Sequence, residues 1–152
     1  MNSEHVLSSG ISLSLRCAVE SDDERIDEVF RKRTGMEPHK LQPGTKCVVA
    51  EVGGQIVAYG YSYGNTIKYL CRLEGSHLSG TADLILESLE KIVRDEGFRD
   101  VGLYAQPAAT GYPLEKLVRF YKRHGYEVNT YRQGFSIDAK PVNLGAEMIK
   151  RF

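Results

Sequence analysis

The segment from Thr81 to Glu96 constrains the fold more than any other part of the chain. Its apolar residues recur at helical spacing and form one stripe: Ala82, Ile85, Leu86, Leu89, Ile92 and Val93. Asp83 in the first turn and Gly97 after the last turn are typical of the two ends of a helix. Strand-like runs lie on both sides, Ile67 to Leu73 before it and Val101 to Ala105 after it. The sequence therefore predicts a strand–helix–strand crossover within one sheet.

The other segments are mostly strands joined by short turns. Cys47 to Val52 and Gln55 to Tyr63 flank Gly53-Gly54, a dipeptide that favours a tight hairpin turn. The remaining expected elements are a strand at Ile11–Val19, helices at Asp22–Arg33 and Leu114–His124, and closing strands at Tyr126–Tyr131 and Ala146–Phe152 around a loose polar turn. Met36–Gly44 and Pro107–Pro113 are expected to be irregular connections. The fold class that follows is mixed α/β (α+β) with a mostly antiparallel sheet.

Length and charge narrow the function classes. A chain of 152 residues predicts one domain over residues 1–152, with residues 1–10 as a flexible N-terminal extension. Twenty basic and twenty acidic residues give no net charge, which argues against a nucleic-acid or membrane partner. Two basic clusters, Arg31-Lys32-Arg33 and the stretch Arg119 to His124, are typical of solvated helix faces. No run of about 20 apolar residues occurs, so we expect a cytoplasmic protein.

The cysteines and histidines do not form a metal motif. Cys17, Cys47 and Cys71 are far apart in apolar, strand-like runs, as expected of reduced core thiols. The chain has no CxxC pair, and its four histidines lack ligand spacing. We therefore expect no metal cofactor.

One loop has the composition of a phosphate-binding segment. His77-Leu78-Ser79-Gly80-Thr81-Ala82 lies between a strand and the start of the strongest predicted helix. A glycine allows a ligand to approach the backbone, and the unpaired N–H groups of a helix start favour anions such as a diphosphate. The same pattern also fits a simple turn before a helix.

A second segment, Leu117 to Val128, also permits two interpretations. It fits an amphipathic helix that ends at Gly125 and leads into a strand. Alternatively, the phenol of Tyr121 could face a ligand and donate a proton to a thiolate leaving group.

Together the two segments resemble the GCN5-related N-acetyltransferase (GNAT) family. Its pyrophosphate loop reads Gln or Arg, two residues, Gly, one residue, then Gly or Ala, which His77, Gly80 and Ala82 match with His in place of Gln or Arg. Its later helix ends in Phe-Tyr, charged residues and Gly-Phe, which Phe120, Tyr121, Gly125 and Tyr126 match with Tyr in place of the last Phe. The resemblance covers roughly Leu13 to Phe152. It implies a GNAT-like acyl-CoA N-acyltransferase fold.

The resemblance also implies a reaction: transfer of the acetyl group of acetyl-coenzyme A to an amine by direct attack in a ternary complex. The backbone N–H groups of Leu78, Ser79, Gly80, Thr81 and Ala82 would hold the diphosphate of coenzyme A, next to His77. The strand from Cys71 to Leu73 would pair with the pantetheine arm. Tyr121 would protonate the departing thiolate, and Glu74 is the nearest carboxylate that could take the amine proton, although it could equally be an ordinary loop residue.

The alternative is a catalytically weak module of the same fold that binds or senses acyl-coenzyme A. His77 and Leu114, which stands where many members of the family have Asn, favour this alternative, whereas Tyr121 argues against it. The acceptor, a small molecule or a protein, would be shaped by the first helix and by Thr34 to Pro43, where Glu37 and His39 could contact it. A homodimer is compatible with this interpretation.

Overall fold

The computed structural model describes residues 2–107 and 112–152. The strands are β1 (Asn2–Val6), β2 (Ser12–Cys17), β3 (Lys46–Val52), β4 (Gln55–Tyr63), β5 (Thr66–Arg72), β6 (Asp100–Ala105), β7 (Glu127–Phe135) and β8 (Pro141–Arg151). The helices are α1 (Asp23–Thr34), α2 (Thr81–Asp95) and α4 (Leu114–Arg123), with short 3₁₀ turns at Glu20–Asp22 and Ser76–Leu78. In the described ranges, no helix is both long and apolar enough to cross a membrane.

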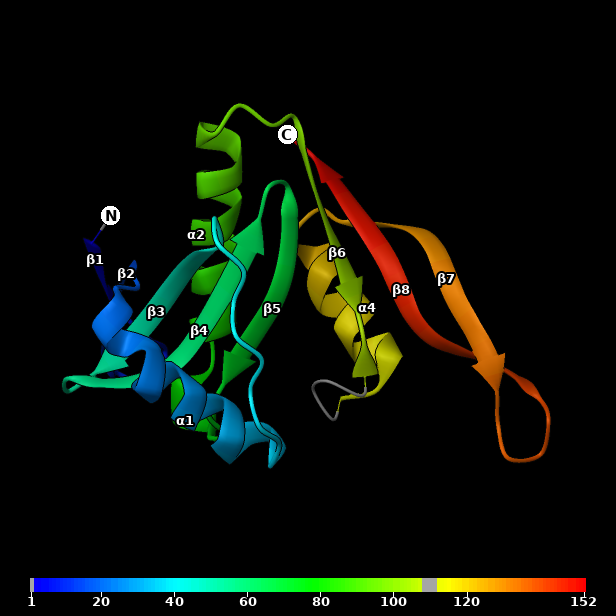
Figure 1. The fold of residues 1–152 in the computed structure, drawn as a ribbon, viewed down its shortest axis with the longest axis horizontal. Coiled ribbons are helices and arrows are strands. Elements are labelled where there is room, and N and C mark those ends of the chain that lie inside the picture. Colours follow the sequence, from blue (N-terminus) through cyan, green and yellow to red (C-terminus); the bar gives the residue numbers. More distant parts are fainter. Residues whose placement is uncertain (1, 108–111) are drawn as a thin grey trace.

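All eight strands join one sheet in the order β1-β2-β3-β4-β5-β6-β8-β7. Neighbouring strands are antiparallel except β5 and β6, which are parallel and connected through α2. The predicted fold class and the predicted crossover are therefore confirmed. The parallel pair is bonded only where Thr66 and Ile67 face Gly102 and Leu103, and the two strands then separate (Figure 1). Beyond these residues, the backbone of β5 is therefore not paired with β6.

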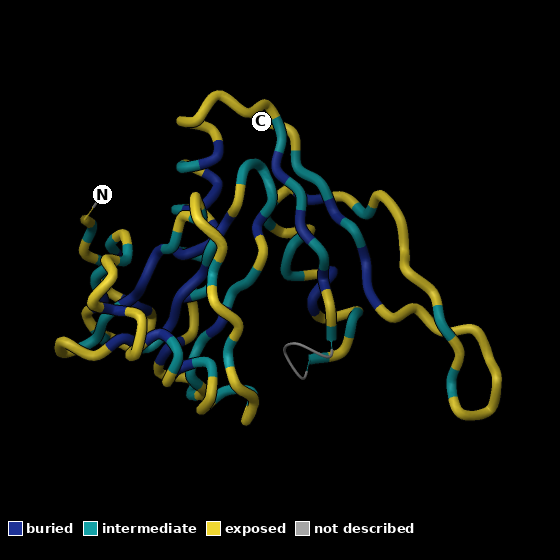
Figure 2. Tube along the Cα trace, viewed as in Figure 1, coloured by how far each residue is buried: buried dark blue, intermediate teal, exposed yellow. Residues whose placement is uncertain are grey.

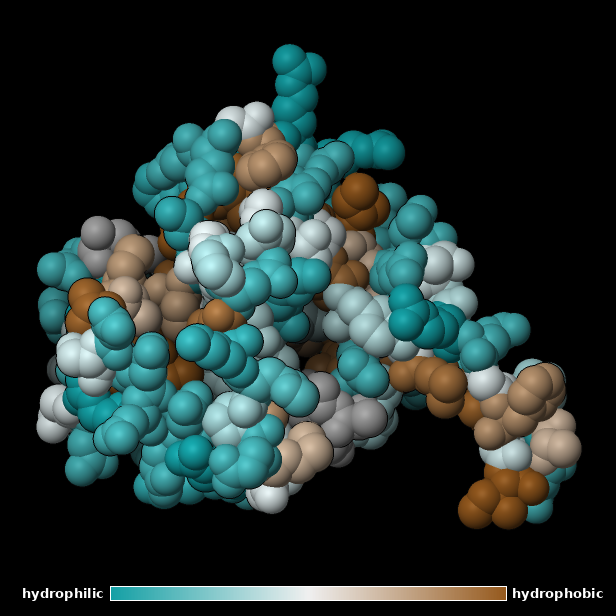
Figure 3. Space-filling view, in the orientation of Figure 1, coloured by the Kyte–Doolittle hydropathy of each residue, from teal (hydrophilic) through white to brown (hydrophobic). Residues whose placement is uncertain are grey.

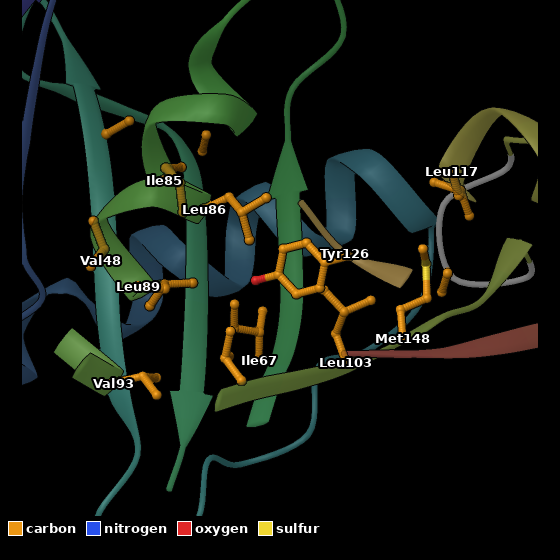
Figure 4. Packing of buried hydrophobic residues seen from close by; sticks show 14 of the residues in the cluster. Val48, Ile67, Ile85, Leu86, Leu89, Val93, Leu103, Leu117, Tyr126 and Met148 are labelled. Atoms are coloured by element: carbon orange, nitrogen blue, oxygen red, sulfur yellow. The ribbon is translucent and has the colours of Figure 1, made fainter. Parts of the chain in front are cut away.

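Helices cover both faces of the sheet. Helix α1 packs on β4 and β5 from one face, and its buried Ile26 and Val29 belong to a small apolar cluster with Tyr59. Helices α2 and α4 cover the opposite face, where the larger cluster includes Leu86, Leu89, Leu117 and Tyr126 (Figure 4). The two faces of the sheet therefore have separate apolar cores.

Gly60 on β4 allows α2 to lie close to the sheet. A Cβ at this position would lie 2.6 Å from Cγ2 of Ile85, a distance that real Cβ contacts do not reach. Any larger residue would push α2 away from β4. Because α2 begins with the predicted phosphate-binding loop, Gly60 also helps to fix the position of that loop.

The N-terminus differs from the prediction. Residues 2–6, expected to belong to a flexible extension, form β1 and pair with β2 from Asn2↔Arg16 to Val6↔Ser12. Leu7 is then buried in the main core, and the hydroxyl of Ser9 donates a 2.7 Å hydrogen bond to the His77 carbonyl. These contacts tie the N-terminal segment to the loop before α2.

The C-terminal strands are longer than predicted. The expected polar turn between residues 131 and 146 is instead a hairpin, with β7 and β8 paired out to Phe135↔Pro141. Strand β6 pairs with β8 only from Ala146 onward, so the rest of the hairpin projects beyond the sheet (Figures 1 and 2). Phe135 is 77% exposed and Ile137 is fully exposed, and apolar atoms gather on this projection (Figure 3). Residues 132–135 of β7 and 141–144 of β8 escaped prediction because almost all of them are exposed and so show no buried face in the sequence.

The remaining connections agree with the prediction where they can be compared. The hairpin at Gly53-Gly54 and helix α2 are confirmed, with α2 ending one residue earlier than expected. Met36 to Gly44 is irregular, as predicted. Most of the Pro107–Pro113 connection lies outside the described residues.

Candidate active site

A cavity of about 870 Å³ lies between β5, the start of α2 and α4. Its wall takes residues from α1, β4, β5, the start of α2, and α4, so it connects the two faces of the sheet. A smaller cavity of about 180 Å³ fills the wedge between β5 and β6. Tyr69, Leu70, Leu117 and Tyr121 line both cavities and therefore mark the place where they meet.

The start of α2 contributes unpaired backbone donors to this cavity. Gly80 precedes the helix with φ = 94°, a conformation that favours glycine, and Ser79, Gly80 and Ala82 line the cavity. Within the described residues, no backbone carbonyl accepts from the amides of residues 80–83, the usual state of the first turn of a helix. These amides, at the positive end of the α2 dipole, form an anion site.

Two of the five predicted amide donors already form hydrogen bonds within the loop. The amides of Leu78 and Ser79 donate to the carbonyls of Gly75 and Ser76, so the 3₁₀ turn already uses them. The Thr81 hydroxyl donates to the Leu78 carbonyl at 2.7 Å and fixes the loop from inside. The set of available donors is therefore Gly80 to Asp83 instead of Leu78 to Ala82.

The cavity wall is strongly cationic although the chain has no net charge. Its basic side chains are Arg33, Arg72, Lys116, Arg119, Lys122 and Arg123. Asp83 is the one acidic residue among the described lining residues, and His124 contacts its carboxylate at 2.8 Å. The basic stretch of α4 is exposed, as expected of a solvated face, and three of its cations also line the cavity. Such a wall suits a ligand with several phosphates.

Tyr121 lies on α4 where the two cavities meet. Its ring packs edge-on against Phe120 and Tyr126, with centroids 5.1 and 5.7 Å away. Burial raises the pKa of Tyr121 to about 12. Among the described residues, none forms a hydrogen bond with its hydroxyl. The phenol therefore stays protonated near neutral pH and can donate a hydrogen bond to a bound group.

The neighbouring phenol of Tyr126 has a structural role. Its hydroxyl donates to Glu90 Oε2 at 2.8 Å, and Lys150 Nζ donates to Glu90 Oε1 at 3.1 Å. All three groups lie at the junction of α2 and β8, where Glu90 is buried. This contact explains why Tyr stands where the family pattern has Phe: the hydroxyl satisfies a buried carboxylate.

Strand β5 presents one free edge to the cavity. Cys71 pairs with Tyr59 of β4, and the Leu73 amide donates to the Val57 carbonyl at 2.9 Å. On the other edge, β6 pairs only with Thr66 and Ile67, so the described strands leave the edge beyond Ile67 open. Cys71 lines the cavity, whereas Leu73 packs into the α1-side cluster. An extended ligand could add to this edge as a strand does.

Aromatic side chains line the cavity on the α1 face. Tyr59 and Tyr69 face it, and their ring centroids are 6.0 Å apart. Burial raises the pKa values of both phenols, and it raises the pKa of the adjacent Cys71 thiol to about 11. These groups are therefore neutral near pH 7, and the Cys71 thiol is a poor nucleophile.

Several predicted site residues lie outside the cavity wall. The Glu74 side chain is 80% exposed and is ion-paired with Arg33, which does line the wall. His77 is exposed in the 3₁₀ turn, and Leu78 and Thr81 are buried beneath the loop. Glu37, on the loop after α1, is ion-paired with Arg31, and neither it nor His39 is among the described residues that line the cavity. The structure thus brings together Cys71, Ser79, Gly80, Ala82 and Tyr121 from the predicted set.

The chain was compared with known proteins by sequence and by structure. No protein-family model and no curated protein sequence matches the chain. Solved structures do match. The PaiA N-acetyltransferase from Thermoplasma acidophilum in complex with coenzyme A aligns with a TM-score of 0.68 and 15% identity over 93% of this chain and 100% of that one. The chain has the GNAT fold.

Two further GNAT structures show the same similarity. A phosphinothricin acetyltransferase from Sinorhizobium meliloti in complex with acetyl-CoA has a TM-score of 0.68 and 18% identity, covering 92% of this chain and 88% of that one. The ribosomal-protein-S18-alanine N-acetyltransferase from Escherichia coli has a TM-score of 0.70 and 10% identity, covering 91% and 93%. The GNAT fold is thus matched along nearly the whole chain by proteins whose named acceptors differ.

Proposed function

We propose that this protein is an N-acetyltransferase that moves the acetyl group of acetyl-coenzyme A to an amine within a ternary complex. The observation that carries the proposal is the cavity whose wall takes residues from both faces of the sheet and which adjoins the smaller cavity between β5 and β6. Its α2 and α4 side offers anion donors and cations, its α1 side offers aromatic groups, and Tyr121 lies where the two cavities meet. A charged cofactor can therefore enter from one face and meet an acceptor that enters from the other.

The cofactor would lie along α2, β5 and α4. Its diphosphate would accept hydrogen bonds from the amides of residues 80–83, supported by the α4 cations Arg119, Lys122 and Arg123. Its pantetheine amides would pair with the open edge of β5 near Cys71. This arrangement would bring the thioester beside Tyr121. Two of the similar structures are complexes with coenzyme A or acetyl-CoA, which supports a cofactor of this kind.

In the reaction, the amine nitrogen would attack the thioester carbonyl, and the carbon–sulfur bond would break to release the thiolate of coenzyme A. A phenol with a pKa of about 12 is a weaker acid than a thiol of ordinary pKa, about 8.5. Tyr121 would therefore act first by donating a hydrogen bond to the developing thiolate, with proton transfer completing late. Most of the rate acceleration would come from holding the two reactants together.

The amine must also lose a proton. Glu74 remains our proposed acceptor of that proton, directly or through water, because it lies beside Arg33 at the α1 end of the cavity. The other carboxylate near the cavity, Asp83, lies at the start of α2 in contact with His124. The α1 side of the wall offers no further carboxylate among the described residues.

A thiol-release assay tests the proposal. The protein would be incubated with acetyl-coenzyme A and a panel of amines, with free coenzyme A and acetylated product measured separately. We expect release that depends on both protein and amine. Binding of coenzyme A without transfer to any amine would instead favour the acyl-CoA-binding module, and absence of both would reject the site.

A further inference from the structure

An arginine–glutamate ion pair lies at the α1 end of the cavity. Arg33, in the last turn of α1, lines the cavity with only 14% of its side chain exposed, and it is ion-paired with Glu74, whose side chain is 80% exposed. The Arg33 guanidinium also lies 5.4 Å from the ring centroid of Tyr112. A fixed cation in the wall and a carboxylate at the rim are thus adjacent where the acceptor would enter.

Among the described residues, no further carboxylate lines this end of the cavity. Asp83, the one carboxylate among the described lining residues, lies across the cavity at the start of α2. Lys116 of α4 also contacts the Tyr112 ring, at 4.6 Å from its centroid. A polycationic acceptor would therefore meet like charges with few carboxylates to bind it.

The same end of the cavity is aromatic. Phe30, Tyr59, Tyr61 and Tyr69 form a cluster in which neighbouring ring centroids are 5.7 to 6.4 Å apart. Tyr59 and Tyr69 contribute the part that faces the cavity. Such a surface favours an apolar or aromatic group over a strongly hydrated one.

We propose that the acceptor is an amine that also carries a carboxylate on an apolar or aromatic body, as in an aromatic amino acid. Its carboxylate binds Arg33, its ammonium approaches Glu74, and its body packs on Tyr59 and Tyr69. A planar guanidinium suits a carboxylate because it can donate two parallel hydrogen bonds. When such a zwitterion binds, the Arg33–Glu74 ion pair is replaced by two ion pairs with the ligand, so the net charge of the site does not change. This inference rests on the proposed acetyltransferase function and names its substrate class.

The first test compares matched acceptors with the wild-type protein. Phenylalanine, 2-phenylethylamine and spermidine would be assayed with acetyl-coenzyme A, and kcat/KM would be expressed per deprotonated amine so that their different amine pKa values do not enter. We expect phenylalanine to exceed 2-phenylethylamine by tenfold or more, on the order of what a charge-assisted hydrogen bond provides. Spermidine should be the poorest acceptor. Equal or better use of 2-phenylethylamine or spermidine would overturn the substrate class while leaving the acetyltransferase function intact.

The second test assigns the preference to Arg33. Arg33→Met should raise the KM for phenylalanine by on the order of tenfold to a hundredfold, remove the preference over 2-phenylethylamine, and leave the KM for acetyl-coenzyme A unchanged. Arg31→Met is the matched control, because Arg31 lies on the same helix, pairs with Glu37 and does not line the cavity. It should behave as the wild type does.

A second variant and two further results complete the test of Arg33. If Arg33→Met does not fold, Arg33→Lys replaces it as the test, because lysine keeps the charge but lacks the planar guanidinium. This variant should lower kcat/KM for phenylalanine more than kcat/KM for 2-phenylethylamine. An unchanged ratio in either folded variant would overturn the role of Arg33. Absence of acetyl transfer to any amine would overturn the proposed function, and this inference with it.

Discussion

The two ends of the cavity are built in different ways. The cofactor end comes from three short continuous segments, the open edge of β5, the start of α2 and the length of α4. The acceptor end combines single residues from distant places: Arg33 from α1, Tyr59 from β4, Tyr69 from β5 and Tyr112 before α4. A ligand with a fixed structure, such as coenzyme A, can be held by local backbone geometry, whereas an acceptor site depends on side chains that the fold brings together. The comparison predicts that changes at the two ends have separable effects.

Replacing Gly80 should have the largest effect, confined to the cofactor end. Gly80→Val forces a β-branched residue to φ = 94°, with its Cβ 3.8 Å from Leu7 Cδ2, so we expect the loop to shift and to move the amides of the first helical turn. Loss of about two charge-assisted hydrogen bonds would weaken coenzyme A binding on the order of 10³-fold. Calorimetry measures this directly. Gly97→Val is the control, because Gly97 follows the other end of α2 at φ = 96° with no atom near its Cβ, so it carries the backbone strain alone. Equal affinity of both variants for coenzyme A would contradict a diphosphate site at the start of α2.

Asp22 should show the next largest effect, on the α1 side. Its buried carboxylate accepts hydrogen bonds from Arg16, Arg25 and the Val19 amide at 2.7 to 2.8 Å, and Arg16 holds the pKa of Asp22 well below its usual range. We expect Asp22→Asn to lower the free energy of unfolding by about 3 kcal/mol at pH 7, because the buried side chain loses its charge-assisted hydrogen bonds with Arg16 and Arg25.

The contribution of Asp22 to the free energy of unfolding should depend on pH. A carboxyl whose pKa is lowered by folding stabilises the fold fully above its unfolded pKa, about 3.9, and loses that contribution as pH falls toward the folded value. Urea unfolding should therefore show the wild type losing its advantage over Asp22→Asn below about pH 4. A constant difference across that range would contradict the assignment.

Tyr121→Phe should separate chemistry from packing at the point where the two ends meet. Removal of the donor to the leaving thiolate should lower kcat about 10²-fold, with little change in the KM of acetyl-coenzyme A. Tyr126→Phe gives the opposite result, because its hydroxyl serves the buried Glu90: stability falls and kcat is retained. Wild-type turnover by a folded Tyr121→Phe protein would show that water protonates the thiolate.

The α4 cations should have a smaller effect that salt weakens. Arg119→Met should reduce coenzyme A affinity by up to about tenfold at low ionic strength and less at high ionic strength, because Arg119 is exposed. Lys91→Met is the control, since Lys91 is exposed on α2 and paired with Asp95 instead of lining the cavity. Titrating each variant with coenzyme A at a low and a high salt concentration measures this difference in affinity. A salt-independent loss would mean that Arg119 acts through packing.

Glu74→Gln should have the smallest effect, at the acceptor end alone. If the carboxylate takes the proton of the amine, kcat/KM falls by a few-fold and most strongly below the pKa of the acceptor amine. Affinity for coenzyme A should not change. A pH–rate profile that matches the wild type would assign proton removal to water.

The sequence predicted the parts of the fold that have local patterns. The stripe of α2, the Gly53-Gly54 hairpin and the pairing of a glycine loop with a helix start all depend on neighbouring residues, and each is confirmed. Strand β1 and the β7–β8 projection escaped prediction because their side chains lack a clear buried face. For the same reason the cationic face of α4 looked like an ordinary solvated surface: only its position beside β5 makes it a wall of the cavity.

The acceptor end was predicted from the sequence only in outline: the first helix and Glu74 were expected to contribute, but not the pairing of Arg33 with Glu74. Arg33 and Glu74 are 41 residues apart and carry no motif, and their contact depends on how α1 lies against β5. Arg33 belongs to a run of three basic residues, of which only this one lines the cavity. Arg33 faces the cavity because of its position around the axis of α1. The sequence alone did not indicate which of the three basic residues would do so.

A structure of the protein with acetyl-coenzyme A bound tests the central claim most directly. The account predicts that the diphosphate lies within hydrogen-bonding distance of the amides of residues 80–83, that the pantetheine arm pairs with β5 beyond Ile67, and that the thioester sulfur lies beside the Tyr121 hydroxyl. A cofactor bound elsewhere, or one whose thioester points away from both Tyr121 and the Arg33–Glu74 pair, would contradict it.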